Sequence, residues 1–276
     1  MKKEKPTRQA VHEEPLAWIR QHVHEEYGIY FPESKIYSLK SKLQRRVRNL
    51  ELEDVAEYAR HLRDNPDEVP YFLDAITTNK TKFFREPKHW HFMEEELIPA
   101  WRGKNEIRIW SGACSSGEEP YTMAILLEEA HRNHSTYPRY RVLASDISEE
   151  VLRRGSRGIY HNRDLQPVKK YNSQFVSRYF DRDPQGNFQV NRDIRRKVYF
   201  RQFNLTFKSN PFSRKFDLIV LKNVLIYFDN EMIQNVIDNS TELLADNGHL
   251  IISHTESLHE IEHSLEKISP SIFQKR

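Results

Sequence analysis

Two acidic side chains and two glycines meet in one short turn of this sequence. After an apolar run at 107–110, residues 111–119 read SGACSSGEE, and a helical pattern follows. Glycine lets the backbone come close to a ligand, and the two carboxylates suit a cationic amine better than a pyrophosphate. Gly112 and Gly117 are five residues apart, which differs from the dinucleotide pattern. A plain strand–helix turn with Glu in its first helical turn explains the segment equally well.

An acid, Asp146, follows the next apolar run at 141–144 and stands two residues before Ser148. At the tip of the second strand of an open α/β sheet, such an acid commonly holds ribose hydroxyls. Its distance from the glycine turn exceeds the usual spacing of about 20 residues in dinucleotide folds, so a longer crossover is required. Asp146 could instead cap a helix that starts near Ser148. Together with the glycine turn, the pattern favours nucleoside binding.

Two further segments carry polar groups that could reach the same site. Residues 78–86 read TNKTKFFRE and mix amide, hydroxyl and guanidinium donors, which can bind a carboxylate. Residues 216–228 read FDLIVLKNVLIYF, so a buried strand would deliver Lys222, Asn223 and Tyr227 near its carboxyl end. Each segment also has a structural explanation, the first as a linker and the second as an apolar strand with incidental polar residues.

The elements that must position these side chains alternate between strand and helix from residue 106 onward. Strands are predicted by the apolar runs at 107–110, 141–144, 216–221 and 249–252, and helices by the patterns at about 118–131, 148–155 and 229–244. This alternation predicts an α/β fold with a mainly parallel sheet covered on both faces. Such sheets carry their ligands at the carboxyl ends of the strands. The polar, turn-rich stretch at about 170–203 predicts an inserted, hairpin-bearing subdomain.

Helical periodicity dominates the N-terminal part of the chain. Apolar residues recur at helical spacing over 16–27, with Gly28 placed to end that helix, and again over 36–50. Two more helices are expected, one from Asp54 and one between 66 and 77. The expected division of the chain is a helical domain over 1–77, a linker and the start of the next domain over 78–105, and the sheet domain over 106–276.

Composition limits the possible functions. Lys and Arg exceed Asp and Glu by only three charges, so partner preference must come from local patches. The single cysteine, Cys114, excludes an internal disulfide framework. The thirteen histidines form no ligand pair, and no metal site is expected. The N-terminus has no signal-peptide pattern, and no stretch approaches the roughly 18 apolar residues of a membrane span. We therefore expect a cytoplasmic protein without direct membrane insertion.

Taken in order, these segments resemble the chemotaxis receptor methyltransferase family, CheR. The matching residues are Asn79-x-Thr81-x-Phe83-Phe84-Arg85-Glu86, Ser115-x-Gly117-Glu118-Glu119-Pro120-Tyr121, Asp146-Ile147, Asn204-Leu205, Asn223-Val224-Leu225-Ile226-Tyr227-Phe228 and His254-x-Glu256-Ser257-Leu258. The likeness spans about residues 15–260. Each motif alone is modest, whereas their joint order and spacing are specific.

The resemblance implies a Rossmann-like S-adenosylmethionine-dependent methyltransferase sheet, a small all-helical N-terminal domain and an inserted small antiparallel β-subdomain. It also implies the residues that bind S-adenosylmethionine: Asn79, Thr81, Arg85, one or both of Glu118 and Glu119, Asp146, Asn204, Leu205, Lys222 and Asn223. By this analogy Asp146 takes the ribose, and Arg85 and Tyr227 line the methyl-transfer site. Lys222 stands where the family often has Arg, which keeps the charge and loses the planar fork.

The reaction implied by the resemblance is transfer of a methyl group to glutamate carboxylates of chemotaxis receptors, which yields methyl esters and S-adenosylhomocysteine. Two other interpretations are a methyltransferase with a different acceptor and a non-catalytic, cofactor-binding signalling module. The sequence does not specify the receptor, the modified glutamates, the oligomeric state or feedback by the product.

A run of basic residues predicts where the partner docks. Residues 34–50 contain six Lys or Arg and no acid, which makes one face of the predicted helix basic. The resemblance favours docking of Lys42, Arg45, Arg46 and Arg48 on the acidic helical bundle of a receptor, whereas a solvated face and nucleic-acid binding are the other interpretations. In some relatives the inserted subdomain binds a peptide at the receptor's carboxyl terminus. The stretch from Tyr179 to Leu205 is a few residues short for that, which favours an enzyme without such a tether.

Overall fold

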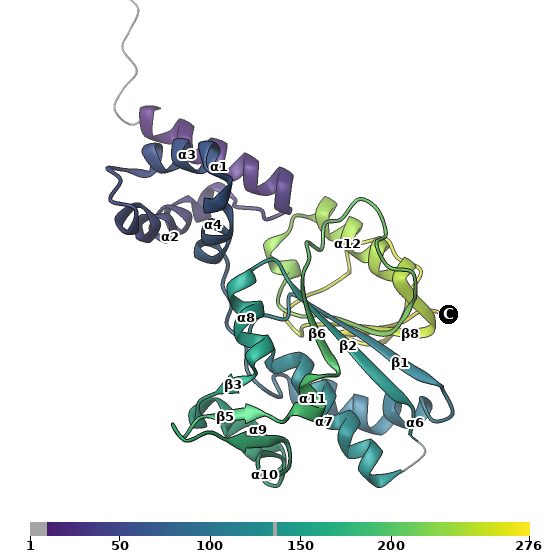
Figure 1. Ribbon diagram of the computed structural model, residues 1–276. Helices are drawn as coiled ribbons and strands as arrows, with labels where there is room; N and C mark the ends of the chain where they lie inside the picture. Colours follow the sequence, from purple (N-terminus) through teal and green to yellow (C-terminus); the bar gives the residue numbers. More distant parts are fainter. Residues whose placement is uncertain (1–9, 135–136) are drawn as a thin grey trace, which may run out of the picture. The chain divides into compact units, whose positions relative to one another are not determined.

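The computed structural model describes residues 10–134 and 137–276, which fall into two compact units (Figure 1). The first, helical unit contains the residues up to Thr78 and the short segment Tyr227–Met232. The second, sheet-containing unit comprises Asn79–Ile226 and Ile233–Arg276. The helical unit is therefore discontinuous in sequence.

The four predicted helices of the helical unit are confirmed. They are α1 (Ala10–Tyr27), α2 (Ile36–Asn49), α3 (Val55–Asp64) and α4 (Val69–Ile76), with 3₁₀ turns at Glu33–Lys35 and Pro66–Glu68. Gly28 ends α1 in the left-handed region, with φ of 71°, and donates its N–H to the His24 carbonyl at 2.8 Å. Asp54 caps α3 by accepting from the Glu57 N–H at 2.9 Å.

A buried ion pair connects α2 to the turn before α4. The Arg46 guanidinium donates two hydrogen bonds to the Glu68 carboxylate, at 2.8 and 2.7 Å, and the Tyr58 hydroxyl donates a third at 2.9 Å. Glu68 is only 5% exposed. Removing one partner of such a pair leaves an uncompensated buried charge, at a cost of about 3–5 kcal/mol. Arg46 therefore stabilises the helical unit, whatever else it contacts.

The main sheet of the second unit has seven strands in the order β6-β2-β1-β7-β8-β10-β9. Its parallel strands are β1 (Glu106–Gly112), β2 (Arg139–Asp146), β6 (Val198–Gln202), β7 (Phe216–Leu221) and β8 (Leu244–Ile252). Two short antiparallel strands follow at one edge, β9 (Glu266–Ser269) and β10 (Ile272–Gln274). Since β1 is central, the carboxyl ends of β1, β2 and β7 lie next to one another.

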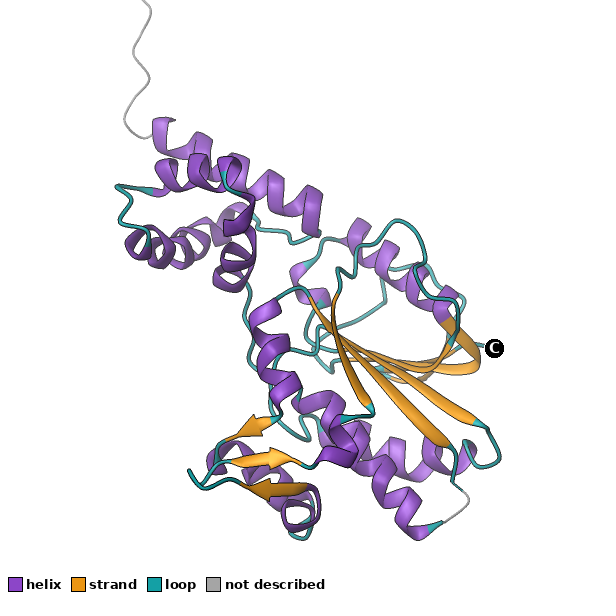
Figure 2. Ribbon diagram, in the orientation of Figure 1, coloured by secondary structure: helices purple, strands orange, loops and turns teal. Residues whose placement is uncertain are grey.

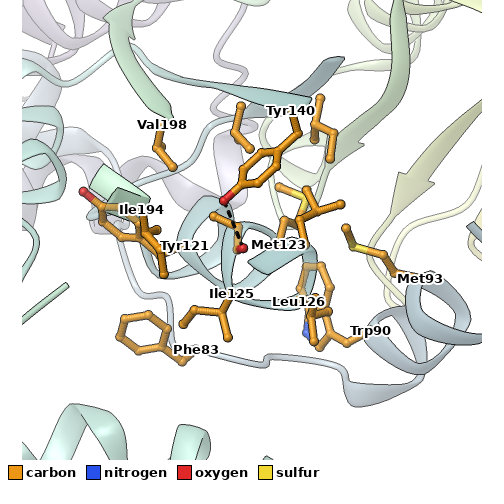
Figure 3. Packing of buried hydrophobic residues seen from close by; sticks show 14 of the residues in the cluster. Phe83, Trp90, Met93, Tyr121, Met123, Ile125, Leu126, Tyr140, Ile194 and Val198 are labelled. Carbon is orange, nitrogen blue, oxygen red and sulfur yellow. Dashed lines mark hydrogen bonds between the residues drawn. The ribbon is translucent and has the colours of Figure 1, made fainter. Parts of the chain in front are cut away.

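Helices cover both faces of this sheet (Figure 2). One face carries α5 (Pro87–Phe92), a π-helical turn (Met93–Leu97), α6 (Ile98–Ala100) and α7 (Glu118–Asn133), and the opposite face carries α12 (Asn230–Leu243). On the first face Trp90 and Met93 join residues of α7 and the strands in one buried cluster (Figure 3). The Tyr140 hydroxyl enters this cluster and donates to the Ala124 carbonyl at 3.2 Å. This dense packing fixes α7 against the strand ends.

The inserted subdomain differs in extent from the predicted 170–203. Its three strands are β3 (Ile159–Tyr160), β4 (Phe180–Arg182) and β5 (Phe188–Val190), in the order β3-β5-β4, with α9 (Gln166–Tyr171) and α10 (Phe175–Tyr179) packed beside them. It therefore begins earlier, because the two-residue β3 was too short to recognise. It also ends earlier, since β6 belongs to the main sheet. β6 is an edge strand whose residues after Val198 are exposed or half-buried, so its sequence lacks the apolar run of a buried parallel strand.

Three short elements complete the sheet unit. They are α8 (Glu149–Arg157), α11 (Arg192–Arg195) and a 3₁₀ turn at Leu225–Tyr227, whose last residue is assigned to the helical unit; a further 3₁₀ turn at Asn162–Leu165 belongs to the inserted subdomain. Over residues 10–134 and 137–276, none of the helices combines the length and apolar character that a membrane crossing needs.

Candidate active site

The glycine turn after β1 is held in a strained, close-packed conformation. A Cβ atom added at Gly112 would lie 2.5 Å from Leu221 Cδ2, so no other residue fits there without a shift. Ala113 and Ser115 have φ of 53° and 50°, and Gly117 has φ of 93° at the start of α7. The turn therefore brings its backbone close to the carboxyl ends of the neighbouring strands.

Asp146 at the end of β2 braces this turn. Its side chain is buried, and Oδ2 accepts from the Ser115 N–H at 2.8 Å while Oδ1 accepts from the Ser148 N–H at 3.0 Å. The N-cap of α8 is Ser148, whose Oγ accepts from the Val151 N–H at 3.3 Å. Asp146 therefore supports the residue that caps α8 as well as bracing the glycine turn.

The two acids at the start of α7 have different partners. Glu119 accepts from the Ser111 hydroxyl at 2.8 Å, and its other oxygen lies 3.4 Å from the Lys222 ammonium. Glu118 accepts from the Ser116 hydroxyl at 2.7 Å. Burial raises the pKa of both carboxyls, because it disfavours the charged form. Both acids therefore have side-chain partners, in addition to their position in the first turn of α7.

The segment that begins at Asn79 lies against the glycine turn. The Asn79 carbonyl accepts from the Ser115 hydroxyl at 2.9 Å, and the Phe84 N–H donates to Thr122 Oγ1 of α7 at 3.1 Å. Arg85 donates from Nη1 to the Lys80 carbonyl at 3.1 Å and is half-buried. These contacts place Asn79 and Arg85 on the same side of the sheet as Asp146.

Thr81, which stands between Asn79 and Arg85 in the sequence, is half-buried. Asn204 and Leu205 reach the site from the chain after β6. The Phe203 N–H donates to the Asp146 carbonyl at 3.0 Å, and Leu205 Cδ2 lies 3.0 Å from the Cβ position at Gly112. Asn204 Oδ1 accepts from both the N–H and the hydroxyl of Thr206, at 3.1 and 3.0 Å. This pair therefore adjoins the ends of both β1 and β2.

Asn223 follows β7 in the left-handed region, with φ of 60°. A buried acid, Glu256, fixes its loop by accepting from the N–H groups of Asn223, Leu225 and Ser253 at 3.1, 2.9 and 2.7 Å. The Asn223 amide also donates to the Ser253 hydroxyl at 2.8 Å. The motif around Glu256 was visible in the sequence, but only the fold reveals that it supports the Asn223 loop.

Two further expected site residues, Lys222 and Tyr227, are held by contacts within the protein. Lys222 is the last buried residue before Asn223, and its ammonium contacts protein groups of the 85–119 region. Tyr227 belongs to the helical unit, where its carbonyl accepts from the Tyr30 N–H at 2.8 Å. The roles expected for Lys222 toward the cofactor and for Tyr227 in methyl transfer stay predictions.

Backbone strain is concentrated in these loops. Of the seven non-glycine residues with positive φ among those described, five are in the site segments: Phe84, Glu86, Ala113, Ser115 and Asn223. Such conformations cost about 1–3 kcal/mol each and cluster at ligand-binding sites. Together with the buried carboxylates, they fit a nucleoside with a cationic amino-acid end. No group of three or more potential metal-ligating side chains occurs within 10–134 and 137–276.

A buried histidine, His89, borders the site, and its burial makes the stability of the fold depend on pH. His89 is 1% exposed, and its Nε2 lies 2.7 Å from the Ser271 hydroxyl, while Nδ1 has no hydrogen-bond partner. The groups that face it are the Glu86 carboxylate at 3.8 Å, the His254 ring at 4.4 Å between centroids, and Lys222. Burial, followed by the Lys222 charge, lowers the pKa of His89 to about 3.

His89 should therefore make the fold sensitive to mild acid. An unfolded histidine takes up a proton near pH 6.5, whereas the folded one does not until about pH 3, so this contribution to stability is lost as the pH falls through that window. The expected loss between pH 7 and 5 is about 2 kcal/mol. The measurement is urea unfolding of the wild type and His89→Gln at both pH values. Equal pH dependence in the two proteins would contradict the prediction. The comparison is needed because buried Glu118, Glu119 and Glu256, whose pKa values are raised by burial, act in the opposite direction.

Two known family models match adjacent ranges of this chain. The family model described as "CheR methyltransferase, SAM binding domain" matches residues 79–273, and "CheR methyltransferase, all-alpha domain" matches residues 14–77. The boundary between the two matches coincides with the boundary of the two structural units at Thr78.

Curated relatives match along most of their length. "Chemotaxis protein methyltransferase" of Borreliella burgdorferi is 34% identical over 261 residues, which cover 92% of this chain and 91% of that protein. The protein of the same name from Escherichia coli is 34% identical over 250 residues, or 88% and 84% of the two chains. "Chemotaxis protein methyltransferase 2" of Pseudomonas aeruginosa is 32% identical over 263 residues, or 94% and 92%.

Proposed function

Because the chain belongs to the CheR methyltransferase family, we propose that it methylates glutamate side chains in the cytoplasmic helical bundle of chemotaxis receptors. It is an S-adenosylmethionine-dependent methyltransferase that acts in chemotaxis. The observation that carries the finer proposal is the gathering of Asp146, Glu119, Asn223 and the Arg85 segment around the ends of three adjacent parallel strands. A cytoplasmic location follows from the proposed substrate.

The residues fit the chemistry of this cofactor. Hydroxyl groups of a ribose suit the Asp146 carboxylate, and an amino-acid end suits the acids of α7 together with donors from Asn79 and Arg85. Asn204 and Leu205 would then adjoin the base, and Asn223 the sulfur end. We assign Thr81 to the same end of the cofactor as Asn79.

The reaction needs alignment more than proton transfer. S-adenosylmethionine supplies an electrophilic methyl group on a sulfonium. The acceptor carboxylate has an ordinary pKa of about 4.3 and is ionised at neutral pH, so no general base is required. The protein must hold the two reactants in line, which can contribute roughly 7–11 kcal/mol, and exclude water from the nucleophile. Arg85 and Tyr227 are the residues that we assign to this alignment.

Transfer of radiolabelled methyl to isolated receptor bundles tests the proposal. Base-labile label on receptor glutamates is the expected result, since methyl esters hydrolyse in mild base. Label on another acceptor would point to a different substrate, and binding of the cofactor without any transfer would point to a signalling module. A receptor variant with its methylatable glutamates replaced by alanine is the control.

For receptor docking we propose the exposed basic side of α2. Arg45 and Arg48 are exposed, and Tyr37 on the same helix is 85% exposed. Lys42 donates to the Ile76 carbonyl at 2.5 Å and Arg46 is held by Glu68, so these two cations have partners within the helical unit. Complementary charge of this kind raises the association rate and sets the register.

Replacing both Arg45 and Arg48 by Glu should raise the KM for receptor about tenfold at low salt, with kcat unchanged. The effect should shrink at high ionic strength, because exposed charges are screened. Initial rates over a series of receptor and salt concentrations measure both quantities. Lys267→Glu, which reverses an exposed charge on β9, is the matched control. Equal KM values in the double variant and the control would contradict docking through α2. Arg46→Ala is unsuitable here, since it breaks the buried pair with Glu68.

We further propose that the enzyme does not need a tethering peptide at the receptor's carboxyl terminus. The support is the short stretch between Tyr179 and Leu205. Methylation rates on full-length receptor and on receptor without its last residues should agree within about twofold. Saturable binding of a tail peptide, or a strong loss of rate on truncation, would contradict this.

A further inference from the structure

Glu86 links three segments at the edge of the candidate site. Its Oε1 accepts from the Ser253 hydroxyl at 2.8 Å and the His254 N–H at 2.9 Å, and its Oε2 lies 3.2 Å from the Lys222 ammonium. Burial alone would raise the pKa of this carboxyl, but the Lys222 charge and the two hydrogen bonds outweigh it and hold the pKa at about 2. Glu86 is thus an anion, on a backbone with φ of 59°.

Lys222 completes the link from the end of β7. Its side chain is 2% exposed, and its ammonium lies 4.5 Å from the centre of the Trp90 ring. An ammonium has three donors. Three oxygen partners surround this one: the Arg85 carbonyl at 3.1 Å, Glu86 at 3.2 Å and Glu119 at 3.4 Å. The ammonium donates a hydrogen bond to the Arg85 carbonyl and forms ion pairs with the two carboxylates, so its buried surroundings are groups of the protein itself.

The backbone of Arg85 is fixed by these contacts. Its carbonyl accepts two hydrogen bonds, from Lys222 Nζ at 3.1 Å and from Trp90 Nε1 at 2.8 Å. The next residue, Glu86, is anchored to Ser253, and the same Ser253 hydroxyl accepts from the Asn223 amide. One buried network thus connects the backbone that carries Arg85 with the loop that carries Asn223.

We propose that Lys222 and Glu86 are a pair of positioning residues, which hold the Arg85 backbone and the Asn223 loop in register, and that Lys222 does not bind the cofactor directly. The inference rests on the role proposed above for Arg85. It differs from the sequence-based expectation, which placed Lys222 among the cofactor ligands. A displacement of about 1 Å in an aligned site can reduce turnover by a factor of 100, so a loosened Arg85 would act on kcat.

Four variants test the pair. Lys222→Met removes the charge and keeps the length of the side chain, Lys222→Arg keeps the charge, and the double variant Lys222→Met/Glu86→Gln removes both charges. Glu86→Gln alone closes the double-mutant cycle. For each protein we would measure kcat at saturating cofactor, the Kd of S-adenosylhomocysteine by calorimetry, and the melting temperature without ligand.

Lys222→Met should lower kcat about tenfold and leave the Kd within threefold of the wild type. Lys222→Arg should restore kcat to within threefold. The double variant should be no slower than Lys222→Met and should melt at a higher temperature, because Glu86 no longer carries an unpaired buried charge. If Lys222→Met does not fold, recovery of folding in the double variant supports the pair by the same reasoning.

Other outcomes would overturn the proposal. A tenfold rise in Kd at unchanged kcat in Lys222→Met would make Lys222 a cofactor ligand. If the fold-losses of kcat in the two single variants multiply in the double variant, the two residues do not act together. The role of Arg85 is tested separately by Arg85→Ala. If that variant equals the wild type, the alignment role fails, while the melting temperatures still decide whether Lys222 and Glu86 are coupled.

Discussion

Replacing Asp146 with Ala should weaken the binding of S-adenosylhomocysteine about 100-fold, which corresponds to roughly 3 kcal/mol. The carboxylate is buried at the end of β2, and hydrogen bonds to a charged group contribute about 1.5–3 kcal/mol each. The substitution also removes the acceptor for the Ser115 N–H and thereby loosens the glycine turn. Calorimetry on the purified protein measures the Kd directly.

Asp146→Asn separates the two effects of this substitution. An amide keeps one acceptor oxygen, so we expect a smaller loss of affinity, of about tenfold. Melting temperatures of both variants without ligand report how far the turn itself is disturbed. If Asp146→Ala binds S-adenosylhomocysteine as tightly as the wild type, Asp146 does not hold the ribose.

Arg85→Ala should lower the rate of methyl transfer at least 100-fold, and should weaken cofactor binding by less than that. We assign Arg85 to alignment of the reactants. Loss of alignment lowers kcat more than it weakens cofactor binding. Single-turnover transfer at saturating cofactor gives the rate of the chemical step, and calorimetry gives the Kd. A rise in Kd with an unchanged single-turnover rate would make Arg85 a binding residue only.

Two variants in the same segment serve as controls for Arg85. Arg85→Lys keeps the charge without the planar donor fork, so partial activity is expected. Lys82→Ala changes an exposed cation three residues away and should leave both rate and affinity unchanged. Loss of activity in Lys82→Ala would mean that the whole segment, and not Arg85, is sensitive to substitution.

The positions of the strand ends could be predicted from the sequence. An apolar run followed by small or polar residues is a local pattern, and it located Gly112, Asp146 and Asn223 at the ends of β1, β2 and β7. The helices of the N-terminal unit were equally accessible, since their periodicity and their signals at Gly28 and Asp54 are local.

The contacts between the site loops could not be predicted. Lys222 and Glu86 meet only when β7 and the start of α5 are brought together, and nothing in either segment marks the other as its partner. The left-handed conformations of Phe84 and Glu86 could not be predicted either, because neither position holds a glycine or an asparagine, the residues that favour this region. Tertiary contacts impose both features.

The edge strands of the main sheet were also not predicted from the sequence. β6 lies at one edge of the sheet, its residues after Val198 are exposed or half-buried, and its sequence resembles the hairpin region before it. β9, at the opposite edge, has four residues, and its inner neighbour β10 has three; neither shows a clear alternation. A strand with a neighbour on one side only is under weaker selection for a continuous apolar run, so its sequence carries less information.

The discontinuous helical unit has a practical consequence for dissecting this protein. The chain passes between the units after Thr78, after Ile226 and again after Met232. A fragment cut at Thr78 would lack the Tyr227 carbonyl that receives the Tyr30 N–H, and the Asp229 carboxylate that lies 2.7 Å from His24. Neither half obtained by a single cut is therefore an intact folding module, and truncation experiments on receptor recognition would report on a damaged surface.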